Sequence, residues 1–213
     1  MRKDNRGLTL IELIVTVAIG MIFSGVVLTF VAGAAKSYRR TSGGAQSQIE
    51  MQDALDQLEN LVMNANLSMY YVKGEKTTTT VTAGDKVDND SDMNSPLNQT
   101  KTLFIGSKEE SADIGTSNSV YSVVVWNADT GDLTFSRQKL SSTGGTAGGE
   151  TDSSDTAELL AQNVTQFAAD IHYVADTHTV RFKLVTKVNG REIEKTETVT
   201  LRNDVVIAAP GTE

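Results

Sequence analysis

Glu12 is the residue whose type and position most directly suggest chemistry. It lies in the apolar stretch LTLIELIVTVAIG, residues 8–20. A carboxylate in a membrane segment is costly and by default functional, because hydrocarbon cannot solvate its charge. A cation that neutralises it would remove much of this penalty, so Glu12 predicts a cationic partner. A second interpretation stays open, in which Glu12 is stabilised by the dipole of a nearby helix N-terminus and reaches the membrane surface.

A row of acidic residues suggests a calcium loop, but the pattern fails at two positions. Asp88, Asp90 and Asp92 have the alternate spacing that opens such a loop. Met93 occupies the position of the turn glycine, and Gln99 that of the bidentate glutamate. We therefore interpret this segment as a solvated acidic loop.

The two histidines, His172 and His178, lie six residues apart near a predicted strand and turn. Two ligands without a third make no good metal site, so we expect both to face solvent. The absence of cysteine excludes disulfides, thiolate metal sites and thiol nucleophiles. The sequence contains neither a nucleophile elbow nor a P-loop. We expect no catalytic residue, no cofactor and no metal site.

The charge balance argues against a nucleic-acid-binding protein. The 213 residues include 19 Lys and Arg against 27 Asp and Glu, a formal net charge of −8. Binding to a phosphate backbone needs a basic surface, so we expect no direct nucleic-acid binding. Lys36, Arg39 and Arg40 do cluster, but they follow the apolar segment directly and are expected to meet lipid head groups.

The element that must position Glu12 is a membrane-spanning helix. Leu13–Ala35 contains no charged residue, and a helix of this length covers about 35 Å, against about 30 Å for the hydrocarbon core. Positive charge ahead of it, at Arg2, Lys3 and Arg6, favours a cytoplasmic N-terminus. A secretory signal peptide is the alternative, with Ala32-Gly33-Ala34 as its cleavage site. The apolar run is longer than the 7–15 residues that such signals use.

The segment around Glu12 closely resembles the processing site of type IV pilins and type II secretion pseudopilins. The matching residues are Gly7-Leu8-Thr9-Leu10-Ile11-Glu12-Leu13, after a short basic leader and before a long apolar helix. The resemblance implies that a prepilin peptidase removes residues 1–7, cutting between Gly7 and Leu8, and methylates the new amine of Leu8. Leu8 departs from the phenylalanine usual at this position.

The resemblance also supplies the cation that Glu12 lacks. Cleavage creates an α-ammonium at Leu8, and a methylated amine keeps that charge. The ammonium of a neighbouring subunit would neutralise Glu12 when apolar helices pack side by side. Such a pair would favour assembly and fix the register of the helices.

We predict an α+β, pilin-like fold: a long N-terminal membrane-spanning helix packed on an antiparallel β-sheet head. The helix is expected over residues 8–70, with 8–35 in the membrane, an interruption at Ser42-Gly43-Gly44 and an amphipathic part over 45–70. The apolar face of that part is formed by Met51, Leu55, Leu58, Val62, Ala65 and Met69.

The head is expected over residues 71–213, with mobile loops at 73–100 and 141–156. The turns Asp129-Thr130-Gly131 and Asn189-Gly190 predict two hairpins. We expect a short strand at 77–82, a helical turn leading into a strand over 158–167, and a strand at 171–174. The other predicted strands are 102–105, 120–126, 133–137, 179–187 and 194–201.

A second resemblance concerns the C-terminal part. Residues 160–167, the hairpin after them and residues 198–203 are similar to PilW-like minor pilins and J-type minor pseudopilins. This implies a structural subunit, not an enzyme, that takes part in assembly or priming of a type IV pilus or a type II secretion-like filament. Its expected partners are prepilin peptidase, other major and minor pilin subunits, the inner-membrane assembly platform and the lipid bilayer.

The expected location is the cell membrane, crossed once, with an extracytoplasmic head that joins a surface or periplasmic filament. The alternative function is a membrane-anchored extracellular binding domain that does not polymerise.

Overall fold

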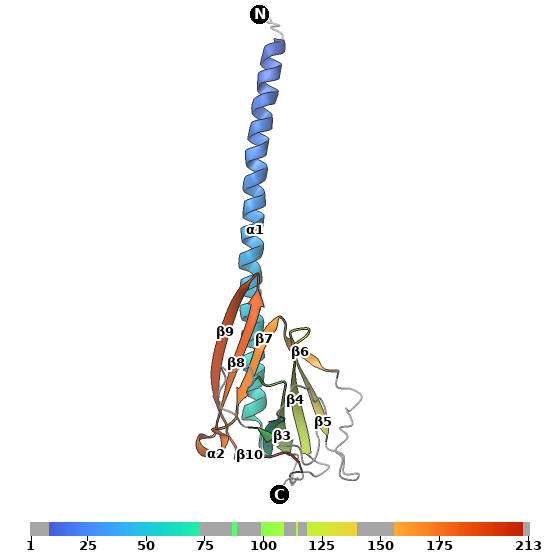
Figure 1. The fold of residues 1–213 in the computed structure, drawn as a ribbon, viewed down its shortest axis with the longest axis vertical. Helices are drawn as coiled ribbons and strands as arrows, with labels where there is room; N and C mark the ends of the chain where they lie inside the picture. The colour runs from blue at the N-terminus through green and yellow to red at the C-terminus, as the bar shows by residue number, and fades with distance from the viewer. Residues whose placement is uncertain are drawn as a thin grey trace, which may run out of the picture. The chain divides into compact units, whose positions relative to one another are not determined.

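The computed structural model describes residues 9–72, 87–88, 99–108, 114, 119–139 and 156–210. The chain divides into two compact units, here called the anchor unit (Met1–Ala45) and the head unit (Gln46–Glu213). One helix, α1, runs from Leu10 to Met63 and contributes to both units (Figure 1). The remaining described elements belong to the head unit, so the fold is α+β with a long N-terminal helix.

Two different environments support the two parts of α1. In the anchor unit every described residue from Thr9 to Ser42 is exposed, so no described part of the chain covers this apolar surface. A helix satisfies its own backbone hydrogen bonds, which is why an apolar run of this length can cross a membrane as a helix. In the head unit the buried residues recur at helical spacing: Ser47, Met51, Ala54, Leu55, Leu58 and Val62. The expected interruption at Ser42-Gly43-Gly44 is wrong for this conformation, because α1 continues through these residues.

The predicted C-terminal end of the helix is also wrong. The regular spacing of apolar residues predicted a helix as far as residue 70. In the structure α1 ends at Met63, and Ser68–Val72 forms strand β1. Ala65 and Met69 are fully buried, as their spacing implied, but in a turn and in a strand. Asn66 marks the change of direction, because its side-chain Oδ1 accepts a hydrogen bond from the backbone nitrogen of Lys108 at 2.7 Å.

The described residues of the head unit form two sheets. In sheet A the strands follow the order β10-β1-β3-β4-β5-β6, with β2 paired to β1, and in sheet B the order is β7-β8-β9. All pairings are antiparallel except that of β1 with β10, which is parallel. Sheet A consists of β1, β2 (Val87–Asp88), β3 (Thr102–Lys108), β4 (Ser119–Asn127), β5 (Asp132–Lys139), β6 (Glu158–Ala161) and β10 (Val206–Ile207). Sheet B consists of β7 (Val164–Asp170), β8 (Thr179–Val188) and β9 (Arg191–Thr200), and a short helix α2 (Val174–Thr177) precedes β8.

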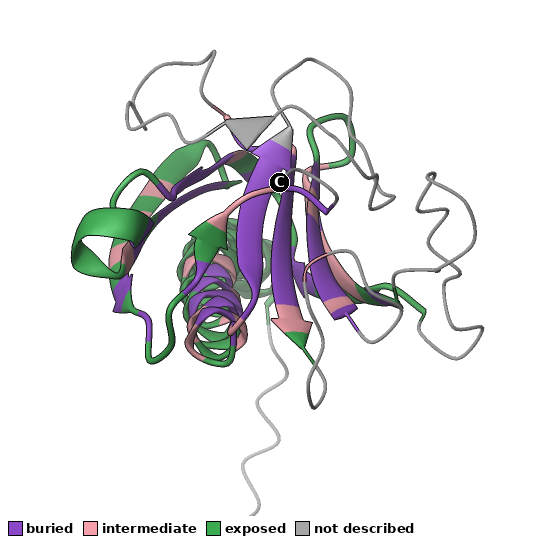
Figure 2. Ribbon diagram, turned by 90° about the horizontal axis from the view of Figure 1, so that it is seen from below, coloured by how far each residue is buried: buried purple, intermediate pink, exposed green. Residues whose placement is uncertain are grey.

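The main core lies where α1 meets both sheets. Figure 2 shows the end of α1 with sheet B on one side and sheet A on the other, and buried surface of both turned toward the helix. Leu58 on α1, Phe167 and Phe182 on sheet B and Leu133 on sheet A are fully buried in one cluster. Each such side chain contributes about 1.5–3 kcal/mol of transfer free energy, as an upper estimate.

A second, smaller cluster involves three aromatic rings of sheet A. Tyr70 and Phe104 stack at 4.5 Å between ring centroids, and Tyr121 meets Tyr70 edge to face. The hydroxyl of Tyr121, on β4, also shares a hydrogen bond of 3.0 Å with the hydroxyl of Ser68 on β1, across the intervening strand β3. The central strands β1, β3 and β4 of sheet A therefore contribute buried residues to both clusters.

Both predicted hairpins are confirmed. β4 and β5 pair across the turn that contains Gly131, whose φ is +77°. β8 and β9 pair across Asn189 and Gly190, which both have positive φ, as a tight two-residue turn requires.

Two other local predictions are wrong. Residues 158–167 form no helical turn but two strands, β6 and β7, separated by a corner at Asn163, whose φ is +57°. The corner is held by the indole Nε1 of Trp126, which donates to the carbonyl of Val164 at 3.1 Å. Residues 171–174 form no strand, because the carboxylate of Asp170 accepts a hydrogen bond from the backbone nitrogen of His172 and turns the chain into α2.

Part of the predicted loop regions lies outside the described residues. This holds for residues 140–155, for most of 73–100 and for the predicted strand at 77–82. Within 73–100, Val87 and Asp88 form β2 against β1.

Candidate functional site

The first turn of α1 holds Glu12 in a reciprocal hydrogen-bonded arrangement with Thr9. The carbonyl of Thr9 accepts the first helical hydrogen bond, from the backbone nitrogen of Leu13, so Thr9 is the N-cap residue. Oε2 of Glu12 accepts hydrogen bonds from the backbone nitrogen and from Oγ1 of Thr9, each at 2.9 Å. The backbone nitrogen of Glu12 donates to Oγ1 of Thr9 at 3.4 Å. This is a capping box.

The capping box determines where the carboxylate is held. Glu12 stays at the N-terminal end of α1, where unpaired backbone N–H groups and the helix dipole favour a negative charge. This turn agrees with the interpretation in which Glu12 is stabilised by the N-terminus of its own helix. Pairing with the ammonium of a neighbouring subunit involves a second chain and stays a prediction. Gly7 and Leu8, the predicted cleavage residues, lie outside the described residues.

Thr9 is a site residue that the sequence interpretation missed. The signal was present, because Thr9-Leu10-Ile11-Glu12 has the T-x-x-E pattern of a capping box. The resemblance to the pilin processing site assigned roles to Gly7, Leu8 and Glu12 but none to Thr9. The threonine matters because its backbone nitrogen and hydroxyl both donate to the carboxylate, and its hydroxyl oxygen accepts from the backbone nitrogen of Glu12.

The apolar surface that follows Glu12 is not covered by any of the residues that the structure describes. An 18-residue window of α1 has a mean hydropathy of 2.5, and none of it is buried. Leu10 and Phe30 are each 77% exposed. This surface needs lipid or other apolar helices around it, because water contact of so much apolar area is unfavourable. Lys36, Arg39 and Arg40 come next on α1 and are exposed, but their predicted contact with lipid head groups stays a prediction.

The weaker candidate sites from the sequence form no common site in the described part of the chain. Asp88 belongs to β2, whereas Asp90 and Asp92 lie outside the described residues. His172 packs its ring edge to face on Tyr173 at 5.2 Å, and His178 lies 3.8 Å from the carboxylate of Asp204. Neither histidine belongs to a group of possible metal ligands among the described residues.

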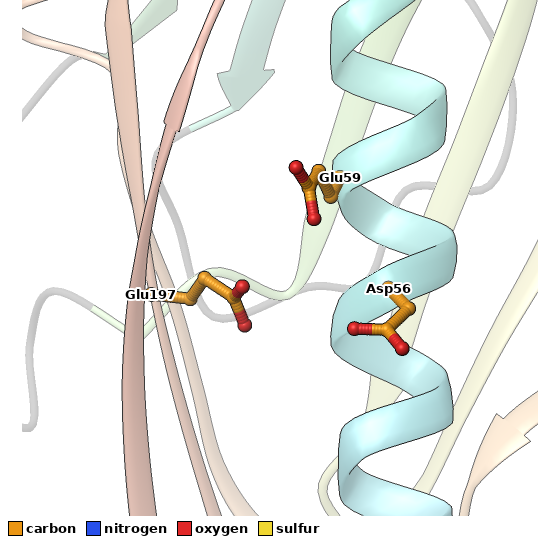
Figure 3. Close-up of side chains that lie close together, drawn as sticks. All are labelled: Asp56, Glu59 and Glu197. Carbon is orange, nitrogen blue, oxygen red and sulfur yellow. The ribbon is translucent and has the colours of Figure 1, made fainter.

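An acidic cluster appears in a place that the sequence did not indicate. The carboxylates of Asp56 and Glu59 on α1 and of Glu197 on β9 lie within 4.8 Å of one another, turned into the space between helix and strand (Figure 3). The spacing of Asp56 and Glu59 on a helix was visible in the sequence. No local pattern could link them to Glu197.

Neighbouring polar groups offset part of this negative charge. Oδ1 of Asp56 accepts a hydrogen bond from Nε2 of Gln52 at 2.6 Å, and Nζ of Lys195 donates to Oε1 of Gln52. Nζ of Lys195 lies 4.0 Å from Oε2 of Glu197. Exposed acidic groups are common without an ion, so we treat the cluster as an electrostatic feature of the contact between α1 and β9.

These observations define a class of protein: one anchored by a single apolar N-terminal helix that has a capped glutamate in its first turn and a β-rich head after it. Residues 2–28 match the family model described as the prokaryotic N-terminal methylation motif, a range that includes Gly7, Leu8 and Glu12. The match supports the type IV pilin and pseudopilin family, whose members are structural subunits. It implies processing by a prepilin peptidase and association with other pilin subunits. Comparisons with curated proteins and with solved structures give no match.

Proposed function

We propose that this chain is a minor pilin or pseudopilin, a structural subunit that takes part in assembly or priming of a type IV pilus or a type II secretion-like filament. It acts after insertion in the membrane, with its head on the extracytoplasmic side. Its further partners are the other major and minor subunits and the inner-membrane assembly platform.

The observation that carries the proposal is the capped Glu12 at the start of an uncovered apolar helix. A membrane anchor alone needs the apolar residues but not a carboxylate among them, which is costly there. A helix that leaves the bilayer to pack against other helices benefits from such a group, because the charge is neutralised only when the right neighbour is in place.

The proposal assigns a role to each residue of the processing site. The peptidase cleaves the bond between Gly7 and Leu8, and the amine of Leu8 is then methylated. The resulting ammonium of one subunit pairs with Glu12 of the next. In this arrangement the capping box presents the Glu12 carboxylate at the end of the helix until the neighbouring subunit arrives.

The experiment that tests the proposal is intact mass and N-terminal sequencing of the protein extracted from membranes of its native host, together with its detection in sheared filaments. We expect a chain that begins with methylated Leu8 and is present in the filament fraction. A chain that begins near Ala35 would identify an ordinary secreted protein and overturn the proposal. A processed chain that never enters filaments would favour the anchored binding domain.

A further inference from the structure

The residues between the membrane span and the first buried position of the head form a helical linker, residues 36–46, in which no residue is buried. In the described part of the chain, Lys36–Ser42 are exposed, Gly43 and Gly44 are half-buried, and Ala45 and Gln46 are exposed. The first buried residue of α1 is Ser47, whose hydroxyl lies 3.2 Å from that of Thr186 on β8. The division between the two compact units falls between Ala45 and Gln46.

The composition of the linker disfavours an unsupported helix. Glycine is the least favourable helix residue after proline, and serine, threonine and tyrosine rank well below alanine. The linker includes Ser37, Tyr38, Thr41, Ser42, Gly43 and Gly44. Most helical stability in proteins comes from packing of an apolar face, and isolated helices shorter than about 12–15 residues are marginal in water.

Gly44 is not required by close packing against the described residues. A Cβ built on Gly44 would meet no atom within 4 Å, so alanine would fit at this position. By contrast, the helix on either side of the linker is supported: the apolar segment by lipid, where backbone groups must stay hydrogen-bonded, and the part after Ser47 by the core.

We propose that residues 42–46 act as a hinge, whose helical hydrogen bonds open and close while the membrane span and the head unit stay folded. Opening lets the head reorient without leaving its anchor. Five opened residues extend the connection by up to about 10 Å, because helical residues rise about 1.5 Å each and extended ones about 3.3–3.6 Å. The hinge depends on membrane anchoring and not on the proposed role in a filament.

Hydrogen exchange of the full-length chain in lipid nanodiscs tests the hinge directly. We expect the amides of residues 42–46 to exchange at least about 100-fold faster than those of residues 54–62 in the same helix. The double variant Gly43→Ala/Gly44→Ala should slow exchange of the hinge by about 30-fold, because each replacement favours the helix. The variant Gly33→Ala, in the membrane span, is the matched control and should leave exchange of the hinge unchanged.

Distance measurements between two spin labels provide an independent test. The chain has no cysteine, so Phe30→Cys and Arg191→Cys label one exposed position in each unit. We expect a broad distance distribution that narrows in the Gly43→Ala/Gly44→Ala background. Hinge amides protected to the same degree as residues 54–62, or one narrow distance distribution without the alanines, would overturn the hinge.

Discussion

Oε2 of Glu12 lies 2.9 Å from both the backbone nitrogen and the hydroxyl oxygen of Thr9. The two residues thus pair their hydrogen-bonding groups at the start of a helix whose next 30 residues are all exposed in the described structure. The same carboxylate can therefore cap its own helix or bind a cation from outside.

The variants Glu12→Gln and Glu12→Ala separate the charge from the cap. Glutamine can take the glutamate position of a capping box, but it has no charge. If Glu12 pairs with the ammonium of a neighbouring subunit, both variants should insert in the membrane and be absent from sheared filaments. Immunoblots of the membrane and filament fractions measure this.

Asp53→Asn is the matched control for Glu12→Gln, because it removes an exposed carboxylate of α1 outside the apolar segment. It should enter filaments normally. Normal incorporation of Glu12→Gln with loss of Glu12→Ala would show that the cap alone matters, and the charge pair would then be wrong.

Glu197→Gln should stabilise the head. Its carboxylate lies within 4.8 Å of those of Asp56 and Glu59, and like charges this close oppose one another. We expect a gain of about 0.5 kcal/mol in the free energy of unfolding at low salt, and a smaller gain at 1 M salt, where charges are screened. Lys195→Gln should have the opposite effect, because it removes the neighbouring positive charge. Chemical denaturation of the full chain in detergent measures both, and a destabilising Glu197→Gln would contradict this account.

Tyr121 should make the head less stable at alkaline pH. Burial raises the pKa of its phenol, although the hydrogen bond with Ser68 acts in the opposite direction. Because the folded state favours the protonated phenol, this contribution to stability is complete below the unfolded pKa of about 10. It is lost as pH rises toward the folded value.

Denaturation between pH 8 and pH 11 measures this effect. Tyr121→Phe should be less stable than the parent chain at pH 8 by about 1 kcal/mol, through the lost hydrogen bond, and its stability should fall less steeply above pH 10. Tyr38→Phe, at a position that is 75% exposed, is the control and should follow the parent curve. Equal slopes for Tyr121→Phe and the parent chain would contradict the role of burial.

Gly106→Ala should destabilise sheet A. A Cβ at this position would lie 2.8 Å from the carbonyl oxygen of Ser68 and 2.9 Å from Cε1 of Tyr121. Neither contact can relax without moving β1 or a fully buried ring, so we expect a loss of about 1–3 kcal/mol. Thermal unfolding measures it. Gly44→Ala, where a Cβ meets nothing within 4 Å, should cause no loss, and an unaffected Gly106→Ala would show that the strands adjust freely.

The features predicted correctly are those that depend on residues close together in the sequence. The charge-free run Leu13–Ala35 predicted a long helix, and the turns at Gly131 and at Asn189-Gly190 predicted the hairpins, because only particular residues adopt positive φ easily. The family motif, likewise, is confined to neighbouring residues at the N-terminus.

The wrong predictions concern positions whose structure depends on contacts between residues far apart in the sequence. Ala65 and Met69 fit the helical spacing because they are buried, but burial alone does not distinguish the end of a helix from the strand that follows it. The corner at Asn163 depends on Trp126, and the acidic cluster depends on Glu197, both far away in sequence. Thr9 is different: the T-x-x-E pattern of a capping box is visible in the sequence, but only the hydrogen bonds show that Thr9 holds the Glu12 carboxylate.

The parallel pairing of β1 with β10 has a consequence for how the protein is made. Ser68 pairs with Val206 and Met69 with Ile207, so strand β1 cannot complete its pairing until β10, far along the chain, has been synthesised. Asn203 closes the same junction by donating to the carbonyl of Ala65 at 2.9 Å. The anchor helix is synthesised long before this point, so sheet A can be completed only after the chain has been made as far as β10. Completion of sheet A thus comes after the apolar helix is available for insertion in the bilayer.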